Sequence, residues 1–450
     1  MQKISIKNMG PIKEFTSELL KMNILIGEQA TGKSTICKSV YFFRTIKDEL
    51  VDYLYYIAVM GVFGSEQQRL GSVTSIDVSD PKKQILNVLN QNLKKKFKQI
   101  FGFDLTPNSA MEMHYVYDAD ISMGITIEES SGDIAFQYSE KLATALKNLE
   151  REFVGTLHHQ ELTDFSFAGA ERRRIHREIK KRVNAIFDDS LSTYYIPAGR
   201  QLLALLSAQK TQIDYSSVDF INRKFMQFIE SLQNFFGGGI KDAHKYNDVP
   251  KHNFDEAYVA QNIIRALKGD YRLRGESEFL VIEDKHQIPF NYASSGQQES
   301  LWVFLQLYAL MLREEPAFVI VEEPEAHLYP SLQHKVLEFI TEFTNINNSS
   351  ALVTTHSPYI LTSANMLYYA GRLSQRKYTG DDLKKILRSS KYIYPDQFTA
   401  WKLNAGGGVE SLVDEEYEDL RSSLIDEVSE EIDRLYTKLY YYEAEHEKEK

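Results

Sequence analysis

The sequence predicts an α/β protein built around a mostly parallel sheet, with a largely helical insertion and a helical C-terminal tail. Short apolar runs typical of buried parallel strands recur along the chain and are separated by helical patterns. These runs are residues 22–26, 193–196, 279–282, 318–321 and 351–354. A glycine-rich loop joins the first run to a helix that begins near Lys33.

Residues 1–50 and 191–400 together form the predicted head of the molecule. Residues 3–7 alternate like a strand, Gly10 and Pro11 mark a turn, and residues 14–20 predict a second strand. Helical patterns at residues 298–313 and 331–344 separate the later strands. Strands that alternate with helices favour a parallel sheet covered on both faces.

The predicted arm, residues 51–190, is inserted into this head. Long amphipathic helices dominate it, and one β-meander covers residues 111–138. Glycines at 406–408 mark a hinge before residues 409–450, an acidic helical tail with apolar residues at helical spacing. Such a tail either packs on its own core or serves as an interaction helix.

Composition excludes several classes of protein. Of 450 residues, 43% are hydrophobic and 26% are charged, which is ordinary for a globular chain and excludes intrinsic disorder. The one cysteine, Cys37, cannot form an internal disulfide. No run approaches the roughly 20 apolar residues of a membrane span, so we expect a cytoplasmic protein without a membrane partner. Residues 414–450 hold 14 acidic and 5 basic residues, so most of the net charge of −11 lies in the tail.

Residues 27–34 match the phosphate-binding pattern G-x-x-x-x-G-K-[ST], and they lie where that pattern must lie, between a strand and a helix. Glycines let backbone N–H groups face phosphate oxygens, Lys33 reaches the β- and γ-phosphates, and Ser34 binds Mg²⁺. The loop therefore predicts a site for ATP and Mg²⁺. Its predicted nucleotide-binding residues are Gly27, Gln29, Gly32, Lys33, Ser34 and Thr35.

Two carboxylates end the apolar strand at residues 318–321. In a parallel sheet this position brings Glu322 and Glu323 beside the phosphate-binding loop. We expect Glu322 to hold Mg²⁺ and Glu323 to orient or deprotonate the attacking water as the catalytic base. Most proteins with this loop have Asp at the first position, where this chain has the longer Glu.

Two further segments lie at the places along the chain where a nucleotide hydrolase carries its phosphate-contacting motifs. Residues 294–298, Ser-Ser-Gly-Gln-Gln, precede a helix, where a hydroxyl and free N–H groups can bind phosphate. We assign Ser295, Gly296 and Gln298 to nucleotide binding. His356 ends the strand at residues 351–354 and matches a sensor of the γ-phosphate.

These motifs, in this order, resemble the ABC-type ATPases of the SMC, RecF and OLD branch. The resemblance is carried by the phosphate-binding loop, the Ser-Ser-Gly-Gln-Gln segment, Glu-Glu-Pro-Glu-Ala-His at 322–327, Thr-Thr-His-Ser-Pro at 354–358 and Tyr-Ile-Pro-Ala-Gly-Arg at 195–200. Most closely, the chain is similar to stand-alone bacterial ATPases of the AAA-15 and AAA-21 group, including the ATPase subunits of anti-phage systems such as Septu and PARIS. The resemblance covers nearly all of residues 1–400 and is weaker in the arm.

The resemblance implies two heads that sandwich two ATP molecules. Ser295 and Gly296 would then contact the γ-phosphate bound to the opposite subunit, and His356 would contact it within its own subunit. Two positions depart from the family pattern, with Gln297 in place of the second signature glycine and Gln29 in place of an asparagine. Gln201 is the candidate for the family's Q-loop glutamine.

The resemblance also implies that this chain works with a separate effector. OLD-family members carry a nuclease after the ATPase, whereas the residues after His356 lack that nuclease's pattern of metal-binding carboxylates. The leading hypothesis is therefore an ATPase that forms homodimers or larger homo-oligomers and controls a nuclease or toxin in anti-phage defence.

Basic helices in the arm support a second hypothesis, a RecF- or SMC-like ATPase that clamps DNA. Residues 172–182 contain seven Lys or Arg residues, and a second basic run covers residues 94–98. Such charge binds phosphate backbones without reading sequence, although solvated arm helices or helices that dock on a neighbour's acidic tail have the same pattern. A third hypothesis, a small-molecule kinase, explains neither residues 294–298 nor His356.

Overall fold

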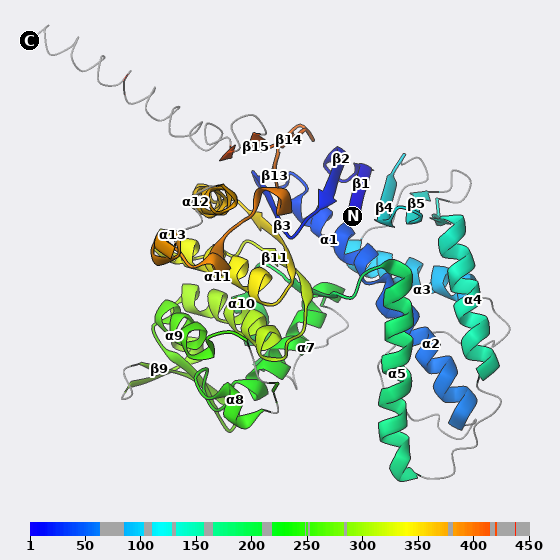
Figure 1. Cartoon of the computed structure of the whole chain (residues 1–450), viewed down its shortest axis with the longest axis horizontal. Coiled ribbons are helices and arrows are strands. Elements are labelled where there is room, and N and C mark those ends of the chain that lie inside the picture. Colours follow the sequence, from blue (N-terminus) through cyan, green and yellow to red (C-terminus); the bar gives the residue numbers. More distant parts are fainter. Residues whose placement is uncertain are drawn as a thin grey trace, which may run out of the picture.

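The computed structural model describes residues 1–63, 85–102, 110–127, 132–156, 165–208, 218–247, 249–250, 253–282, 286–376, 381–414, 419–420 and 437. Figure 1 shows a head of sheets and helices from which α2, α4 and α5 project as an arm. No helix within these residues is long and apolar enough to cross a membrane.

The strands are β1 (Gln2–Met9), β2 (Ile12–Leu19), β3 (Met22–Gly27), β4 (Glu112–Asp118), β5 (Ile121–Ile127), β6 (Ile134–Tyr138), β7 (Ser192–Ile196), β8 (Asp270–Arg274), β9 (Ser277–Ile282), β10 (His286–Pro289), β11 (Ala317–Glu322), β12 (Ser350–Thr355), β13 (Phe398–Leu403), β14 (Val409–Ser411), β15 (Val413–Asp414) and β16 (Asp419–Leu420). The helices are α1 (Lys33–Arg44), α2 (Ile46–Phe63), α3 (Ile85–Phe101), α4 (Glu140–Thr156), α5 (Phe165–Phe187), α6 (Arg200–Ala208), α7 (Phe220–Phe235), α8 (Ala243–Tyr246), α9 (Glu256–Leu267), α10 (Ser295–Leu312), α11 (Pro330–Ile346), α12 (Pro358–Gln375) and α13 (Asp381–Ile386).

The central sheet has the strand order β14-β13-β3-β12-β11-β7. All neighbours in it are parallel except β13 and β14, so the predicted α/β class is confirmed. Thr354 lies opposite Glu322, and Thr355 lies opposite Ile26. Strands β3, β12 and β11 therefore end at the same edge of the sheet, beside one another.

Each face of this sheet packs against its own hydrophobic core, because successive side chains of a strand point to opposite faces. On β11, Val319 and Val321 join a core formed with α7, α9, α10, α11 and α12. Phe318 and Ile320 join a second core formed with β1, α1, α3 and the strands of the meander. The site edge of the sheet is thus held rigidly from both sides.

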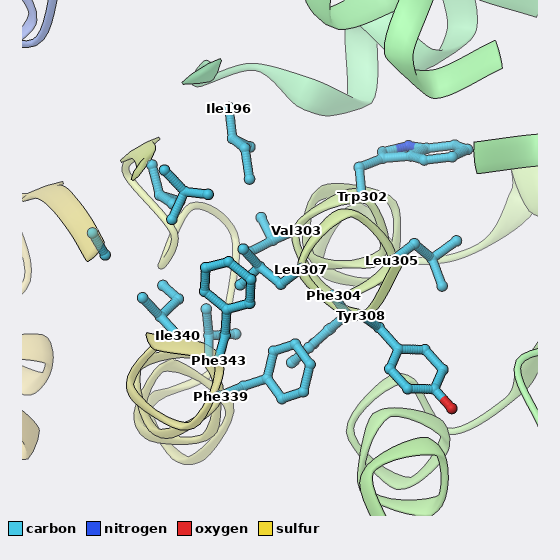
Figure 2. Close-up of a cluster of buried hydrophobic side chains, with 14 of the residues drawn as sticks. Ile196, Trp302, Val303, Phe304, Leu305, Leu307, Tyr308, Phe339, Ile340 and Phe343 are labelled. Atoms are coloured by element: carbon cyan, nitrogen blue, oxygen red, sulfur yellow. The ribbon is translucent and has the colours of Figure 1, made fainter. Parts of the chain in front are cut away.

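Helix α10 lies at the centre of the first core. Its residues from Gln298 to Leu312 are all buried, which explains why its sequence is apolar around the whole helix rather than on one stripe. Figure 2 shows Trp302 on one side of α10 and Phe304 and Tyr308 on the other, with Phe339 and Phe343 of α11 close by. This packing anchors the helix whose first residue is Ser295.

One predicted strand of the parallel sheet is corrected by the structure. Residues 279–282 belong to β9, which pairs antiparallel with β8 and β10 in a separate three-stranded sheet. Leu280 is fully buried, but its neighbours on β9 are only partly so. A short apolar run alone does not distinguish a strand buried on both faces from one that packs a single face.

The meander and the tail also differ from what their patterns suggest. Strand β4 pairs antiparallel with β1, so the meander extends the sheet of β1 and β2 and is continuous with the head. Residues 406–408 form the turn of the hairpin β13–β14 rather than a hinge. Residues 409–411, 413–414 and 419–420 are strands instead of helix, and nearly all of the later tail lies outside the described residues.

The arm is a bundle of helices. Helix α2 packs against α4 and α5, and α3 packs against α4. Its root is a buried ion-pair cluster in which Asp189 Oδ2 lies 2.9 Å from both Arg44 and Lys47. Because Arg44 is the last residue of α1, the arm is joined directly to the helix that follows the phosphate-binding loop.

Candidate active site

The loop between β3 and α1 has the geometry of a phosphate cradle. Gly32 adopts a left-handed φ of 101°, and a Cβ there would lie 2.7 Å from Ile12 Cγ1. At Gly27 a Cβ would lie 2.3 Å from the carbonyl oxygen of Leu403, so only glycine fits against β13. No side chain in the described part of the chain caps α1, which leaves the N–H groups of its first turn available to an anion.

Lys33 lies inside this loop and is only 6% exposed. Its Nζ donates hydrogen bonds to the carbonyl oxygens of Gly27, at 2.8 Å, and Glu28, at 2.7 Å. Burial lowers the pKa of Lys33, and the negative charges of Glu323 and Glu325 oppose that shift. The two backbone carbonyl groups thus hold the ammonium group of Lys33 within the phosphate-binding loop.

The other predicted residues of the loop lie along its outer side. Gln29 and Ser34 are exposed, and Thr35 is half-buried in the first turn of α1. The Ser39 hydroxyl donates to the carbonyl oxygen of Thr35 at 2.7 Å, and this hydrogen bond stabilises the first turn of α1. Ser34 is thus accessible to a ligand in the first turn of α1, and its role as a metal ligand stays a prediction.

The residues present fit a magnesium ion that is bound mainly through a nucleotide. Glu322 ends the wholly buried strand β11, and among the described residues its buried Oε1 atom has no partner in good hydrogen-bond geometry. Within the described residues, no group of three or more His, Cys, Asp or Glu side chains could hold a metal by itself. Ser34 and Glu322 would supply two oxygen ligands, and phosphate oxygens and water would complete the preferred shell.

His356 connects the predicted catalytic groups. Its Nε2 atom lies 3.1 Å from Glu323 Oε1, and its Nδ1 atom lies 3.4 Å from Lys33 Nζ. An ammonium group can only donate, so Nδ1 accepts the proton of Lys33 and Nε2 carries the ring proton toward the carboxylate. The first residue of α1 and the residues that follow β11 and β12 therefore form one chain of polar contacts.

Glu323 has an unusual backbone. Its φ is 44°, in the left-handed region that non-glycine residues seldom adopt. The Glu323 N–H donates to Thr354 O at 3.0 Å, and its carbonyl oxygen accepts from Ala326 N. Its side chain is 38% exposed, which leaves the carboxylate accessible to water and nucleotide.

Glu325 is a further site residue, to which the sequence motifs assign no role. Its Oε1 atom accepts hydrogen bonds from the Thr355 hydroxyl at 2.6 Å and from the His356 backbone N–H at 2.7 Å. Glu325 is 9% exposed and fixes the turn that carries His356. The Glu-Glu-Pro-Glu spacing at 322–325 was the available signal.

The segment before α10 is built as a helix start. Ser294 is the N-cap, and it forms a reciprocal capping box with Gln297. Ser295 is exposed at the first helical position. At Gly296 a Cβ would lie 2.9 Å from the carbonyl oxygen of His327, so a glycine is needed to pack against the turn that follows Glu323.

The structure gives Gln298 a different role from the predicted nucleotide contact. Gln298 is 3% exposed, and its Nε2 atom lies within 2.8–3.2 Å of the carbonyl oxygens of Phe290, Asn291 and Ala293. A buried amide with these partners holds the preceding loop. Motif order alone could not reveal this, because exposed and buried positions alternate within the first turn of a helix.

A buried arginine, to which the sequence motifs also assign no role, connects the end of β11 with helix α10. Arg200 begins α6 and donates to the carbonyl oxygens of Glu322, at 2.6 Å, and Glu323, at 2.9 Å. It also contacts Glu299 of α10. The backbone N–H of its neighbour Gln201, the Q-loop candidate, donates to Glu299 as well.

The fold and this site define a P-loop nucleotide-binding protein in which Lys33, Glu323 and His356 converge. A family model described as AAA ATPase domain, AAA_15, matches residues 1–361. The chain belongs to this family, and the family implies ATP binding.

Comparisons with individual proteins give more distant relatives. Over 121 residues the chain is 30% identical to the lipoprotein-releasing system ATP-binding protein LolD of Neorickettsia sennetsu. That match covers 25% of this chain and 52% of the relative, so the chain spans about half the length of LolD. Among solved structures, it is similar to an SMC head bound to the C-winged helix domain of ScpA, with 12% identity, a TM-score of 0.39 and coverage of 92% of this chain and 98% of that one. It is also similar to the SMC head domain from Thermotoga maritima, with 10% identity, a TM-score of 0.33 and coverage of 80% and 90%.

Proposed function

We propose that this protein is an Mg-ATP-dependent ATPase of the ABC type that pairs head to head and controls a separately encoded effector, a nuclease or toxin, in anti-phage defence. The observation that carries the ATPase part is the chain of polar contacts Lys33–His356–Glu323. It brings a phosphate-binding cation, a polar sensor and a carboxylate base to one edge of the sheet. A general base must lie within hydrogen-bond reach of the water it activates, and Glu323 is exposed enough for that.

The proposed hydrolysis uses each of these groups separately. Lys33 and the first N–H groups of α1 bind and orient the phosphates. Glu323 accepts a proton from the attacking water, while His356 fixes the orientation of its carboxylate through the Nε2–H bond. Bound Mg²⁺, held by Ser34 and Glu322, would neutralise charge on the β- and γ-phosphate oxygens.

Exposed tyrosines around the site support the head-to-head pairing. Tyr292 and Tyr329 are each 78% exposed and Tyr359 is 53% exposed. Each lies close in sequence to a site motif: Tyr292 precedes Ser295, Tyr329 follows Glu323, and Tyr359 follows His356. Aromatic residues are enriched in the centres of protein interfaces. Among the described residues, no hydrogen bond joins Ser295 or Gly296 to the phosphate-binding loop of the same chain, which favours a role in trans.

The effector part rests on the sequence resemblance to ATPases of anti-phage systems. An ATP-driven change of pairing would hold or release the effector. The second candidate function is a DNA-clamping ATPase, which the exposed Arg173, Arg174 and Arg177 on α5 favour. A toxin or nuclease gene next to this one would support the first, and salt-dependent DNA binding by the purified protein would support the second.

Mixing two inactive variants tests the composite site. Lys33→Ala removes the phosphate-binding cation, and Ser295→Arg places a bulky cation at the start of α10. In a mixed dimer, one site combines an intact loop with an intact signature, so hydrolysis should recover. Ser277→Arg, at an exposed position of β9, is the matched control and should hydrolyse ATP like the wild type. Wild-type hydrolysis by Ser295→Arg alone would contradict the role of the signature.

A further inference from the structure

Arg200 is buried completely, and its guanidinium group contacts both the end of β11, beside Glu323, and helix α10, which begins at Ser295. On one side, Nη1 and Nη2 donate to the carbonyl oxygens of Glu322 and Glu323. On the other side, Nε lies 3.1 Å from Glu299 Oε2 and donates to the Glu299 carbonyl oxygen at 3.0 Å. One planar group thus bridges the end of β11 and the first turns of α10.

Glu299 is held as firmly as its partner. It is 2% exposed, and its carboxylate accepts the backbone N–H groups of Arg200 and Gln201 at 3.1 Å each. These N–H groups belong to the first turn of α6, where the helix dipole favours a negative charge. Glu299 lies four residues after Ser295 on α10, one helical turn away.

We propose that Arg200 and Glu299 are positioning residues that couple the signature at Ser295 to the catalytic base Glu323. This inference rests on the proposed function, because it assumes that Ser295 acts on nucleotide and that Glu323 acts as the base. A shift of α10 on contact with the second subunit's nucleotide would move Glu299, and Arg200 would carry that movement to the backbone of Glu323.

The backbone of Glu323 makes it sensitive to such a movement. A non-glycine residue at φ 44° keeps that conformation only when its surroundings hold it. Arg200 supplies one hydrogen bond to its carbonyl oxygen, and the Ala326 N–H in the turn that follows supplies another. A buried ion pair is by itself weak evidence of a stabilising role, since apolar residues of similar volume often serve as well. The hydrogen bonds of this pair to the site are what apolar residues could not supply.

The test separates coupling from stability. Arg200→Lys keeps the charge but cannot span both carbonyl oxygens and Glu299, so kcat per nucleotide-binding site should fall at least ~10-fold while ATP affinity is unchanged. The double variant Arg200→Met with Glu299→Met should fold, as checked by thermal unfolding, and should be equally slow. In a Glu323→Gln background, both should weaken ATP-driven dimerisation measured by light scattering.

Arg44→Lys is the matched control, since Arg44 is also a fully buried arginine paired with a carboxylate, Asp189. It should lower the unfolding temperature and leave kcat per nucleotide-binding site unchanged. Wild-type kcat in the folded double variant would overturn the coupling role. If wild-type protein itself neither hydrolyses ATP nor dimerises with it, the proposed function fails instead, and the two failures are thereby distinguished.

Discussion

The Nε2 atom of His356 lies 3.1 Å from Oε1 of Glu323, although the two residues come from different strands and are 33 positions apart. Because Nδ1 of the same ring faces Lys33, the imidazole is oriented from both sides. The Glu323 carboxylate is therefore oriented by a ring that itself has polar partners on both sides.

Glu323→Gln should bind ATP normally but hydrolyse it at least ~10²-fold more slowly, because an amide cannot accept the proton of the attacking water. The variant should accumulate as an ATP-bound dimer, which size-exclusion chromatography with light scattering measures. Glu314→Gln is a matched control, since Glu314 is a glutamate with a similar left-handed φ of 47° that lies outside the site. Equal turnover by the two variants would show that another group is the base.

Gly296→Ala should destabilise the head and slow hydrolysis. The added Cβ would lie 2.9 Å from the backbone carbonyl oxygen of His327, so either α10 or the turn after Glu323 must shift. The expected decrease in the free energy of unfolding is about 1–3 kcal/mol, measurable by urea denaturation. Gly406→Ala should be tolerated, because no heavy atom of the described residues lies within 4 Å of the added Cβ. A fully stable, fully active Gly296→Ala protein would refute this packing argument.

Asp52 should make stability depend on pH. Burial, with repulsion from Glu49 and Asp48, raises the pKa of Asp52 from 3.8 to about 6. Protonation therefore favours the fold: this contribution is complete below about pH 4 and is lost as pH rises through 6. Asp52→Asn, which cannot ionise, should exceed wild type in stability at pH 7.5 by on the order of 1–2 kcal/mol, after allowance for partial exposure.

Denaturation series at pH 4 and pH 7.5 check this prediction, and the advantage of Asp52→Asn should vanish at the lower pH. Asp382→Asn, at an exposed side chain of α13, serves as the control and should show no such pH-dependent gain. A gain of equal size at both values would exclude titration of Asp52 as the cause.

Reversal of charge at Arg173, Arg174 and Arg177 should reduce any DNA affinity of the protein. For each phosphate that these side chains no longer neutralise, the slope of log affinity against log salt concentration should become shallower by ~0.9. Reversal of Lys384 and Lys385 on α13 is the control and should leave the slope unchanged. If all these proteins bind DNA alike at low salt, the basic surface of α5 is a solvated face of the arm.

Much of the nucleotide site could be predicted because its residues are close in sequence to strand ends. Lys33, Glu323 and His356 each follow an apolar run, and parallel strands bring such ends together. Arg200 and Glu325 were missed because their roles depend on partners about 100 and 30 residues away. The Glu-Glu-Pro-Glu spacing marks Glu325 but not its partners on the neighbouring strand. No local pattern shows that Arg200 reaches Glu299, or that Gln298 turns its amide into its own loop.

Local sequence patterns are also insufficient to place every strand of the central sheet. Strand β13 was not predicted, because residues 398–403 contain Thr, Trp and Lys among apolar residues and lack a continuous apolar run. They nevertheless pair with β3 along its whole length. The run at 279–282 was assigned to the central sheet by its composition, but a neighbouring hairpin partner determined its place.

The position of β13 has a consequence for how the protein is made on the ribosome. Strand β3 lies between β12 and β13, and Asn23 on it bonds to Ala351 and Thr399, partners 328 and 376 residues later in the chain. Pairings of such long separation form slowly. The nucleotide cradle, which Leu403 closes against Gly27, can therefore be completed only after the last strand beside it has been synthesised. A nascent chain carries its phosphate-binding loop early and gains a working site late.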